Sequence, residues 1–272
     1  MYESEEAASD LIDVVRGIVA AVANSLSLSR LQGITLSTDY RQALSQIDRG
    51  VPGLRPPSSI DPTIGQGIAQ TVDVVRNETV MCRVVLDSSV GFSLLSNDAA
   101  TVNWATSIFV RQLILVSLTE AVDVALPGRV LRPIEDPLQG WLHAAVGPAL
   151  DGYVSSYMAS GFSDANELAI GWRGLLKEAL DRLHNTVLPA RLAYREHGDL
   201  DKLLSVAMPN IQHVLLFAAD LLGHCAALGI EAVSAGSDLD LALSRAGLKN
   251  WLPRYAADLE AFRLRYGKWR SF

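Results

Sequence analysis

Residues 104–126, WATSIFVRQLILVSLTEAVDVAL, are the stretch that decides the fold. In a helix formed by this stretch, apolar side chains would cover nearly the whole circumference, which predicts a helix buried on most sides. Ser96-Asn97-Asp98 precede it with side chains that can accept hydrogen bonds from the first turn of a helix, and Pro127-Gly128 end it. Arg111 and Glu120 interrupt the apolar run, so the stretch is a poor membrane span. We therefore expect a buried central helix from about residue 104 to 126.

Composition limits the class of protein. The chain has 272 residues, of which 49% are hydrophobic and 19% charged, below the roughly 25% charged residues of an average soluble chain. This balance favours a compact helical protein with an apolar surface for a protein or peptide partner, and leaves a homo-oligomer possible. A net charge of −7 argues against a nucleic-acid binder, which needs clustered basic residues. The acidic start, MYESEEAASD, does not resemble a signal peptide, so we expect a cytoplasmic protein outside the membrane.

The strand signals are confined to the first third of the chain. β-Branched runs at Thr71–Val75 and Thr79–Leu86 surround the short polar segment Arg76-Asn77-Glu78, which predicts an antiparallel β-hairpin over about 71–86. A lone hairpin is marginally stable, so we expect helices or a third strand against it, with Ile34–Leu36 as the candidate. The expected fold class is mostly α (α+β), a helical domain around the central helix with this small hairpin.

Helices are predicted along the rest of the chain, which we expect to form a single domain, 1–272. Pro148 predicts a break in the helix that begins at Leu138, and Pro209 predicts the first turn of a helix over 210–228. Cys82 and Cys225 fit neither a disulfide framework nor a zinc-finger spacing, and we expect both to be small buried side chains.

The order of elements resembles the minimal core of zincin-like metallopeptidases, in which a short sheet lies along a helix that bears the motif HExxH. The resemblance covers about residues 38–160, followed by a helical C-terminal half over about 163–266. In that family two histidines one turn apart bind one zinc ion, and the glutamate between them activates the metal-bound water. A following helix supplies a third ligand, often the glutamate of an EY-x-A-type segment.

The positions that carry this chemistry in the family are altered here. The HELAHV-like segment falls on 111–116, where Arg111 replaces the first histidine, Gln112 the base and Leu115 the second histidine. The later segment falls on 152–155, where a glycine replaces the ligand and only Tyr153 remains; Asp151 lies one residue before that ligand position. The resemblance therefore implies a scaffold without catalysis, metal or cofactor, which binds a protein or peptide. We expect an extended peptide to pair with the hairpin edge, at Thr71–Val75 or Thr79–Leu86.

A different class of function is left open by the predicted helix over 210–228. His213, Asp220 and His224 share one stripe of that helix, and Asp220 and His224 are one turn apart, so they could contact a common metal ion. The alternative hypothesis is a metal-dependent hydrolase with its site at these three residues. His213 is roughly 16 Å from His224 along the helix axis, so one ion cannot bind all three. A third possibility is a helical assembly subunit, which a large exposed apolar patch would favour.

Overall fold

A computed structural model of the chain describes residues 5–54, 56–57, 60–61, 65–128, 130–132, 134–162 and 164–265. It is 67% helical with a small three-stranded sheet, which confirms the predicted fold class. The chain forms two compact units. Of the described residues, those up to 132 together with 161, 162 and 164 form the first unit, and 134–160 together with 165–265 form the second. Helix α5 (Pro137–Ala159), which the resemblance grouped with the zincin-like core over about 38–160, belongs to the second unit; a single domain stays a prediction.

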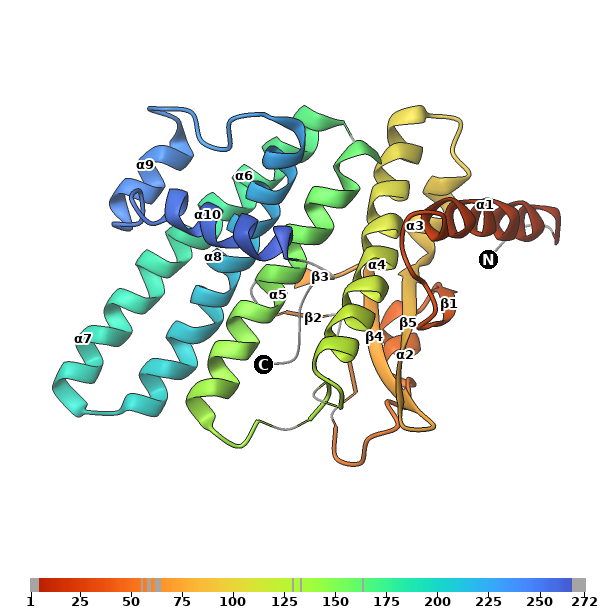
Figure 1. The fold of residues 1–272 in the computed structure, drawn as a ribbon. Helices are drawn as coiled ribbons and strands as arrows, with labels where there is room; N and C mark the ends of the chain where they lie inside the picture. The colour runs from red at the N-terminus through yellow and green to blue at the C-terminus, as the bar shows by residue number, and fades with distance from the viewer. Residues whose placement is uncertain are drawn as a thin grey trace. The chain divides into compact units, whose positions relative to one another are not determined.

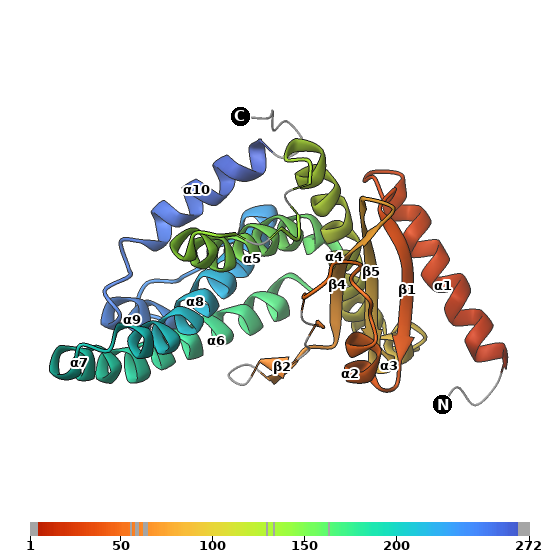
Figure 2. The same cartoon turned by 90° about the horizontal axis from the view of Figure 1, so that it is seen from below.

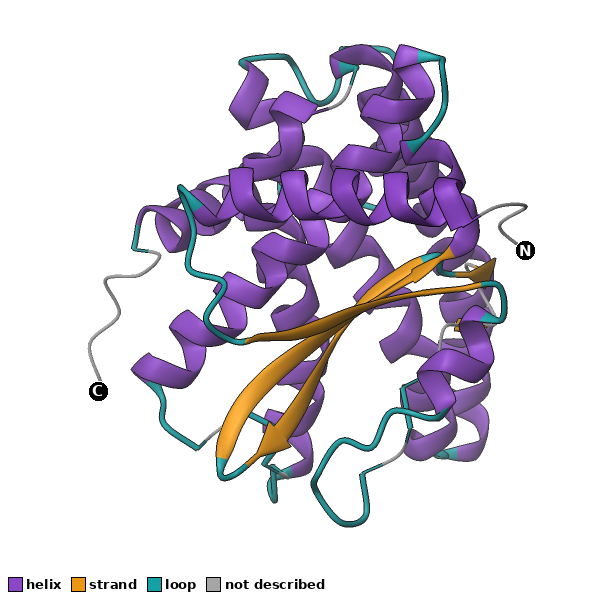
Figure 3. Ribbon diagram, turned by 90° about the vertical axis from the view of Figure 1, so that its right-hand side faces the viewer, coloured by secondary structure: helices purple, strands orange, loops and turns teal. Residues whose placement is uncertain are grey.

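The first unit is a three-stranded mixed sheet with helices on both faces (Figures 1 and 3). Its elements in chain order are α1 (Glu5–Ala23), β1 (Leu31–Ser37), α2 (Tyr40–Ser45), β4 (Ala69–Arg76), β5 (Thr79–Asp87), α3 (Ser88–Leu94) and α4 (Ala99–Ala125). A separate two-residue pair, β2 (Ile60–Asp61) and β3 (Gly65–Gln66), lies between α2 and β4 in the sequence.

The strands have the order β1-β5-β4. The β4–β5 hairpin is antiparallel and turns at Asn77 and Glu78, which both have positive φ, as a two-residue type I′ turn requires. This confirms the predicted hairpin. The third strand is also present, but β1 runs parallel to β5, with a register shift between Leu31 and Gly33. The sheet is therefore mixed, because the long connection from β1 to β4 allows a parallel crossover that a short turn would not.

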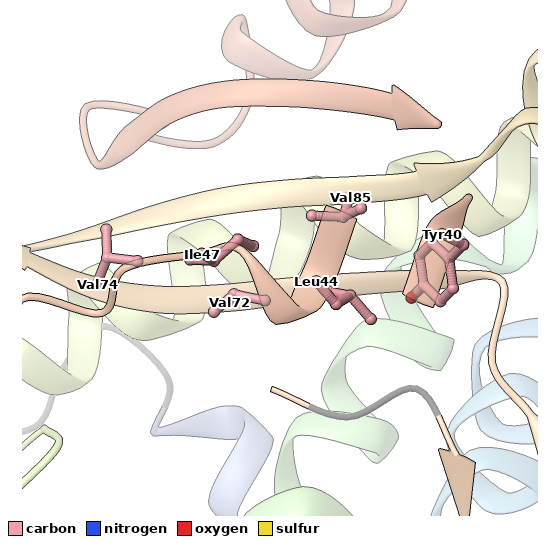
Figure 4. Packing of buried hydrophobic residues seen from close by; sticks show 6 residues of the cluster. All are labelled: Tyr40, Leu44, Ile47, Val72, Val74 and Val85. Carbon is pink, nitrogen blue, oxygen red and sulfur yellow. The ribbon is translucent and has the colours of Figure 1, made fainter. Parts of the chain in front are cut away.

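The two faces of the sheet are covered by different helices. On one face, α2 packs against the valines of β4 and β5 (Figure 4). This cluster consists of Tyr40, Leu44, Ile47, Val72, Val74 and Val85. On the other face lies α4, which contacts β4 and β5. Because side chains alternate along a strand, Val72 and Val74 face α2 whereas Thr71 and Asp73 face α4.

Helix α4 is the predicted buried central helix. Asp98 caps it, because its side chain accepts a hydrogen bond from the N–H of Thr101 at 2.9 Å. The helix begins at Ala99, five residues before the expected start at Trp104, and ends at Ala125. Phe109, Leu113 and Val116 are fully buried in its middle. The cap and the apolar content predicted from the sequence are thus both confirmed.

The second unit is a bundle of helices (Figures 1 and 2). They are α5 (Pro137–Ala159), α6 (Ala165–Arg182), α7 (Leu188–His197), α8 (Leu200–Leu228), α9 (Asp238–Arg245) and α10 (Leu252–Leu264). A 3₁₀ turn, η1 (Ser160–Phe162), precedes α6, and a π-helical turn, η2 (Leu183–Val187), joins α6 to α7. One described helix, α8, is long and apolar enough to span a membrane, but 61% of its most apolar window is buried inside the structure, as in the core helix of a soluble protein.

Two proline predictions are wrong. Helix α5 continues through Pro148, and α8 runs without a break from Leu200 through Pro209 to Leu228. A proline leaves the carbonyl four residues earlier without its helical donor. Those carbonyls belong to Ala144 and Ser205. Both residues are exposed, so water can supply the missing hydrogen bonds and the helices continue.

Candidate functional site

The degenerate motif positions on α4 are part of the packing between α4 and the sheet. Gln112 is buried, and the hydroxyl of Thr71 on β4 lies 2.9 Å from its backbone carbonyl and 3.1 Å from its side-chain Oε1. Arg111 and Leu115 are half-buried. Gln112 therefore links α4 to β4 through its hydrogen bonds with Thr71.

The other two positions of that motif lie on α5, in the second unit. Asp151 is exposed, whereas Tyr153 is buried and donates a hydrogen bond to Oε2 of Glu260 on α10 at 2.9 Å. Glu260 also accepts two hydrogen bonds from the Arg263 guanidinium, at 2.7 and 2.8 Å. That guanidinium lies over the ring of Tyr157, 4.0 Å from its centroid. Tyr153 thus belongs to a polar network that holds α10 against α5.

The pKa values in this network fit a structural role. The two hydrogen bonds from Arg263 lower the pKa of Glu260, and burial with the Glu260 carboxylate raises the pKa of Tyr153. Both groups are therefore held in their ordinary states at neutral pH, a carboxylate and a protonated phenol. Neither is tuned toward proton transfer near neutrality.

The residues of the metal hypothesis are all buried on α8, as their common stripe predicted. Asp220 accepts a hydrogen bond from Ser156 of α5 at 2.9 Å. The ring of His213 stacks on Phe217 with centroids 6.0 Å apart, and His224 has no solvent exposure. Within the described ranges, no group of three or more histidine, cysteine, aspartate or glutamate side chains is arranged to hold a metal ion. The metal-dependent hydrolase therefore gains no support from this geometry.

A polar network that the sequence did not reveal lies between the sheet and α4. Asp73 of β4 accepts hydrogen bonds from the Thr119 hydroxyl at 3.0 Å and the Cys82 thiol at 3.5 Å. Nearby, Arg30 forms an ion pair with Asp123 at 3.2 Å. These residues are far apart in the sequence, so no local motif brings them together.

Burial determines the titration of this network. Desolvation raises the pKa of Asp73, and the hydrogen bonds from Thr119 and Cys82 together with the charge of Arg49 offset part of that rise. Burial, followed by the charge of Asp73, raises the pKa of the Cys82 thiol. A thiol with a raised pKa is a poor nucleophile, which agrees with the expected role of Cys82 as a small buried side chain.

The sheet has two edges, and one of them is closed over part of its length. Strand β5 is central and pairs on both sides, so the prediction that Thr79–Leu86 offers an edge is wrong. On β4, the N–H of Val75 donates to the carbonyl of Arg49 at 2.8 Å, and Nε of Arg49 donates to the carbonyl of Asp73 at 3.2 Å. Gly50 has a φ of +68°, and a Cβ there would lie only 2.1 Å from the Val75 carbonyl. The predicted edge over Thr71–Val75 is thus occupied by the chain itself from Asp73 onward.

The direction of the backbone groups in β5 shows which groups of β1 face outward. The N–H of Cys82 donates to the carbonyl of Arg30, just before β1, whereas the N–H of Asp87 donates to Ile68, just before β4. Hydrogen-bonding directions alternate along a strand. Even-numbered residues of β5 therefore bond toward β1, and odd-numbered residues bond toward β4.

The outer edge of β1 is open at Ile34 and Leu36. Ile34 and Leu36 lie opposite Val84 and Leu86, so the N–H and C=O groups of Ile34 and Leu36 point away from β5. No hydrogen bond from another described residue reaches these four groups. We take this edge as the candidate functional site.

Comparisons with protein-family models, curated proteins and solved structures found no match to this chain. The zincin-like resemblance therefore stays a prediction, and the functional argument depends on the geometry alone.

Proposed function

We propose that this protein is a non-catalytic binding protein that captures an extended peptide as an additional strand along β1. The observation that carries the proposal is the unpaired row of two N–H and two C=O groups at Ile34 and Leu36. Exposed rows of this kind pair readily with another extended chain, and peptide-binding domains use them for recognition. The altered residues Arg111, Gln112 and Leu115 agree with binding, because they supply neither zinc ligand nor base.

The side chains of β1 indicate which peptide would fit. Opposite residues of neighbouring strands share a face, so Ile34 and Leu36 lie on the same face as the buried Val84 and Leu86. An added strand would place alternate side chains beside these apolar residues. The proposed ligand is therefore an extended peptide with apolar residues at every second position.

The test begins with peptides selected from a random library on the full chain. Each selected peptide is then resynthesised with one backbone amide methylated at a time, and its dissociation constant is measured. Strand addition predicts loss of binding at every second amide, because only those amides donate to β1. Equal tolerance at all positions, or a bound peptide that is helical by NMR, contradicts the proposal.

A variant of the protein tests the same contact from the other side. Leu36→Pro removes an N–H that points away from β5, so no hydrogen bond within the sheet is lost. We expect it to abolish peptide binding, whereas the matched Leu36→Ala retains the N–H and weakens binding only through the lost side chain. Circular dichroism and thermal unfolding of both variants establish that the fold persists. Unchanged binding by folded Leu36→Pro would refute the proposed edge.

A further inference from the structure

Arg83 is a cation without a counterion in the three-stranded sheet. It lies in the central strand, β5, and is half-buried. Its Nε is buried, and among the described residues its guanidinium has neither a hydrogen-bond partner nor an ion-pair partner. Removing a charged donor from water without supplying an acceptor is unfavourable, so a ligand that brings an acceptor to this guanidinium would be stabilised there.

The nearest neighbours of Arg83 in the sheet show why it has no partner. Val72 of β4 lies opposite Arg83, so both face α2 (Figure 4). Met81 and Val85 lie two residues away along β5 and share that face. On the other side, Gly33 of β1 lies opposite Arg83. None of these four neighbours has a side-chain oxygen or nitrogen, so none can pair with the guanidinium.

Gly33 leaves space between Arg83 and the outer edge of β1. The register shift beside it requires a glycine only where φ is positive, and Gly33 does not have a positive φ. A Cβ at residue 33 would meet no heavy atom of a described residue within 4 Å, so packing does not require a glycine either. A glycine inside a strand often marks a place that a ligand approaches closely. The space over Gly33 is therefore open to a side chain that reaches toward Arg83 from beyond β1.

We propose that the peptide bound along β1 carries a glutamate beside Gly33, and that its carboxylate pairs with the Arg83 guanidinium. This inference rests on the proposed strand addition and specifies its ligand. Two strand spacings, roughly 10 Å, separate the Cα of a peptide residue beside Gly33 from the Cα of Arg83. A glutamate and an arginine side chain that lean toward each other span this distance, because glycine puts nothing between them. A carboxylate can accept two hydrogen bonds from one guanidinium, which makes the contact specific.

The proposal predicts a sequence pattern for the ligand. The glutamate is adjacent in the peptide to the two alternate apolar residues beside Ile34 and Leu36, and it lies on the opposite face of the sheet. A parallel peptide has the glutamate before the apolar pair, and an antiparallel peptide has it after the pair. The net charge of −7 favours basic peptides at long range. A preference for an acidic residue at this one position would therefore arise from a local contact.

Selection from a synthetic peptide library tests the pattern. The peptides have apolar residues at two alternate positions, random residues elsewhere and amidated C-termini, so that only side chains supply carboxylates. We expect glutamate to be enriched next to the apolar pair on the wild-type chain but not on Arg83→Gln. The matched control is Arg254→Gln at an exposed position of α10, which removes the same charge and should keep the enrichment. Equal enrichment on Arg83→Gln and the control would overturn the proposal.

Dissociation constants for one selected peptide test the contact itself. Replacing the peptide's glutamate by glutamine should weaken binding to the wild-type chain about fivefold and should have little effect on binding to Arg83→Gln. Gly33→Val should abolish the preference for glutamate, because its side chain would lie between the carboxylate and the guanidinium. Circular dichroism establishes that both variants are folded. A preference for glutamate that survives in folded Gly33→Val would contradict a side chain crossing at this position.

Methylation of the peptide amides separates this inference from the proposed function. Loss of binding at every second amide, without any effect of the glutamate, would refute the pairing with Arg83 and leave strand addition supported. Absence of the alternating pattern would refute strand addition, and the pairing with it.

Discussion

Gly223 of α8 lies directly against the backbone of Tyr153 in α5: a Cβ at residue 223 would be 2.3 Å from the Tyr153 carbonyl oxygen. No side chain can occupy that space without moving a helix, because the obstacle is backbone. Gly152, on the other helix, has a milder contact, since its nearest neighbour is the Asp220 side chain at 2.9 Å. This close approach of α5 and α8 therefore requires glycine at residue 223.

Gly223→Ala should therefore destabilise the protein. We expect the free energy of unfolding to fall by about 1–3 kcal/mol, because α5 and α8 must separate. The matched control is Gly171→Ala on α6, where a Cβ meets nothing within 4 Å. That change should raise stability by about 0.5–1 kcal/mol through helix propensity. Denaturant titration of both variants measures the difference, and a neutral Gly223→Ala would contradict the close contact.

Tyr40→Phe should leave stability unchanged or raise it. Tyr40 is buried in the α2 cluster, and its hydroxyl has no hydrogen-bond partner among the described residues. Burying an unpaired hydroxyl costs about 1–3 kcal/mol, and removing it recovers part of that cost. The measurement is urea unfolding followed by far-ultraviolet circular dichroism. A clear loss of stability would mean that the hydroxyl has a partner in solution.

Glu260→Gln should reduce the loss of stability that the protein shows as the pH falls below about 4.5. Arg263 lowers the pKa of Glu260 in the folded state, so the carboxylate stabilises the fold above its ordinary pKa of 4.5. That contribution is lost as the pH falls below 4.5 through the lower folded pKa. The comparison is thermal unfolding of wild type and variant across this range, with the exposed Glu178→Gln as control. Parallel profiles would show that the ion pair does not form.

Asp73→Asn should have the opposite dependence on pH. Burial raises the pKa of Asp73 in the folded state, so ionisation at neutral pH opposes folding. The penalty is absent below the ordinary pKa of 3.8 and grows as the pH rises through the folded pKa. Asparagine retains an acceptor for Thr119 without the charge, so its stabilising effect should appear above that range. Asp10→Asn, at an exposed position on α1, is the control.

The sequence predicted best those helices and turns that are determined by residues close together in the chain. The cap at Asp98 and the apolar run that follows it depend on neighbouring residues, and the bounds of α4 agree with the prediction within five residues. The hairpin turn at Asn77 and Glu78 is local as well. The proline predictions were wrong because residues 144 and 205, whose carbonyls lose their helical donors, are exposed, so water can reach those carbonyls, which a propensity rule does not consider.

Features that depend on distant residues were not predictable. The parallel pairing of β1 with β5 follows from the path of a long connection, and it decides which edge of the sheet stays open. The Asp73 network joins residues of two strands and α4 across 46 positions, from Asp73 to Thr119. The spacing of His213, Asp220 and His224 predicted that they share one side of α8. It could not show that the hydroxyl of Ser156, on another helix, donates a hydrogen bond to Asp220.

The mixed topology of the sheet has a consequence for the order of folding. Strands β4 and β5 are joined by a two-residue turn, whereas β1 must close a loop of about 40 residues before it meets β5. We expect pulse-labelled hydrogen exchange to show protection of β4 and β5 before β1. The chain would then complete its sheet by adding β1 to the preformed β4–β5 hairpin, and the outer edge of β1 would remain available to a further strand.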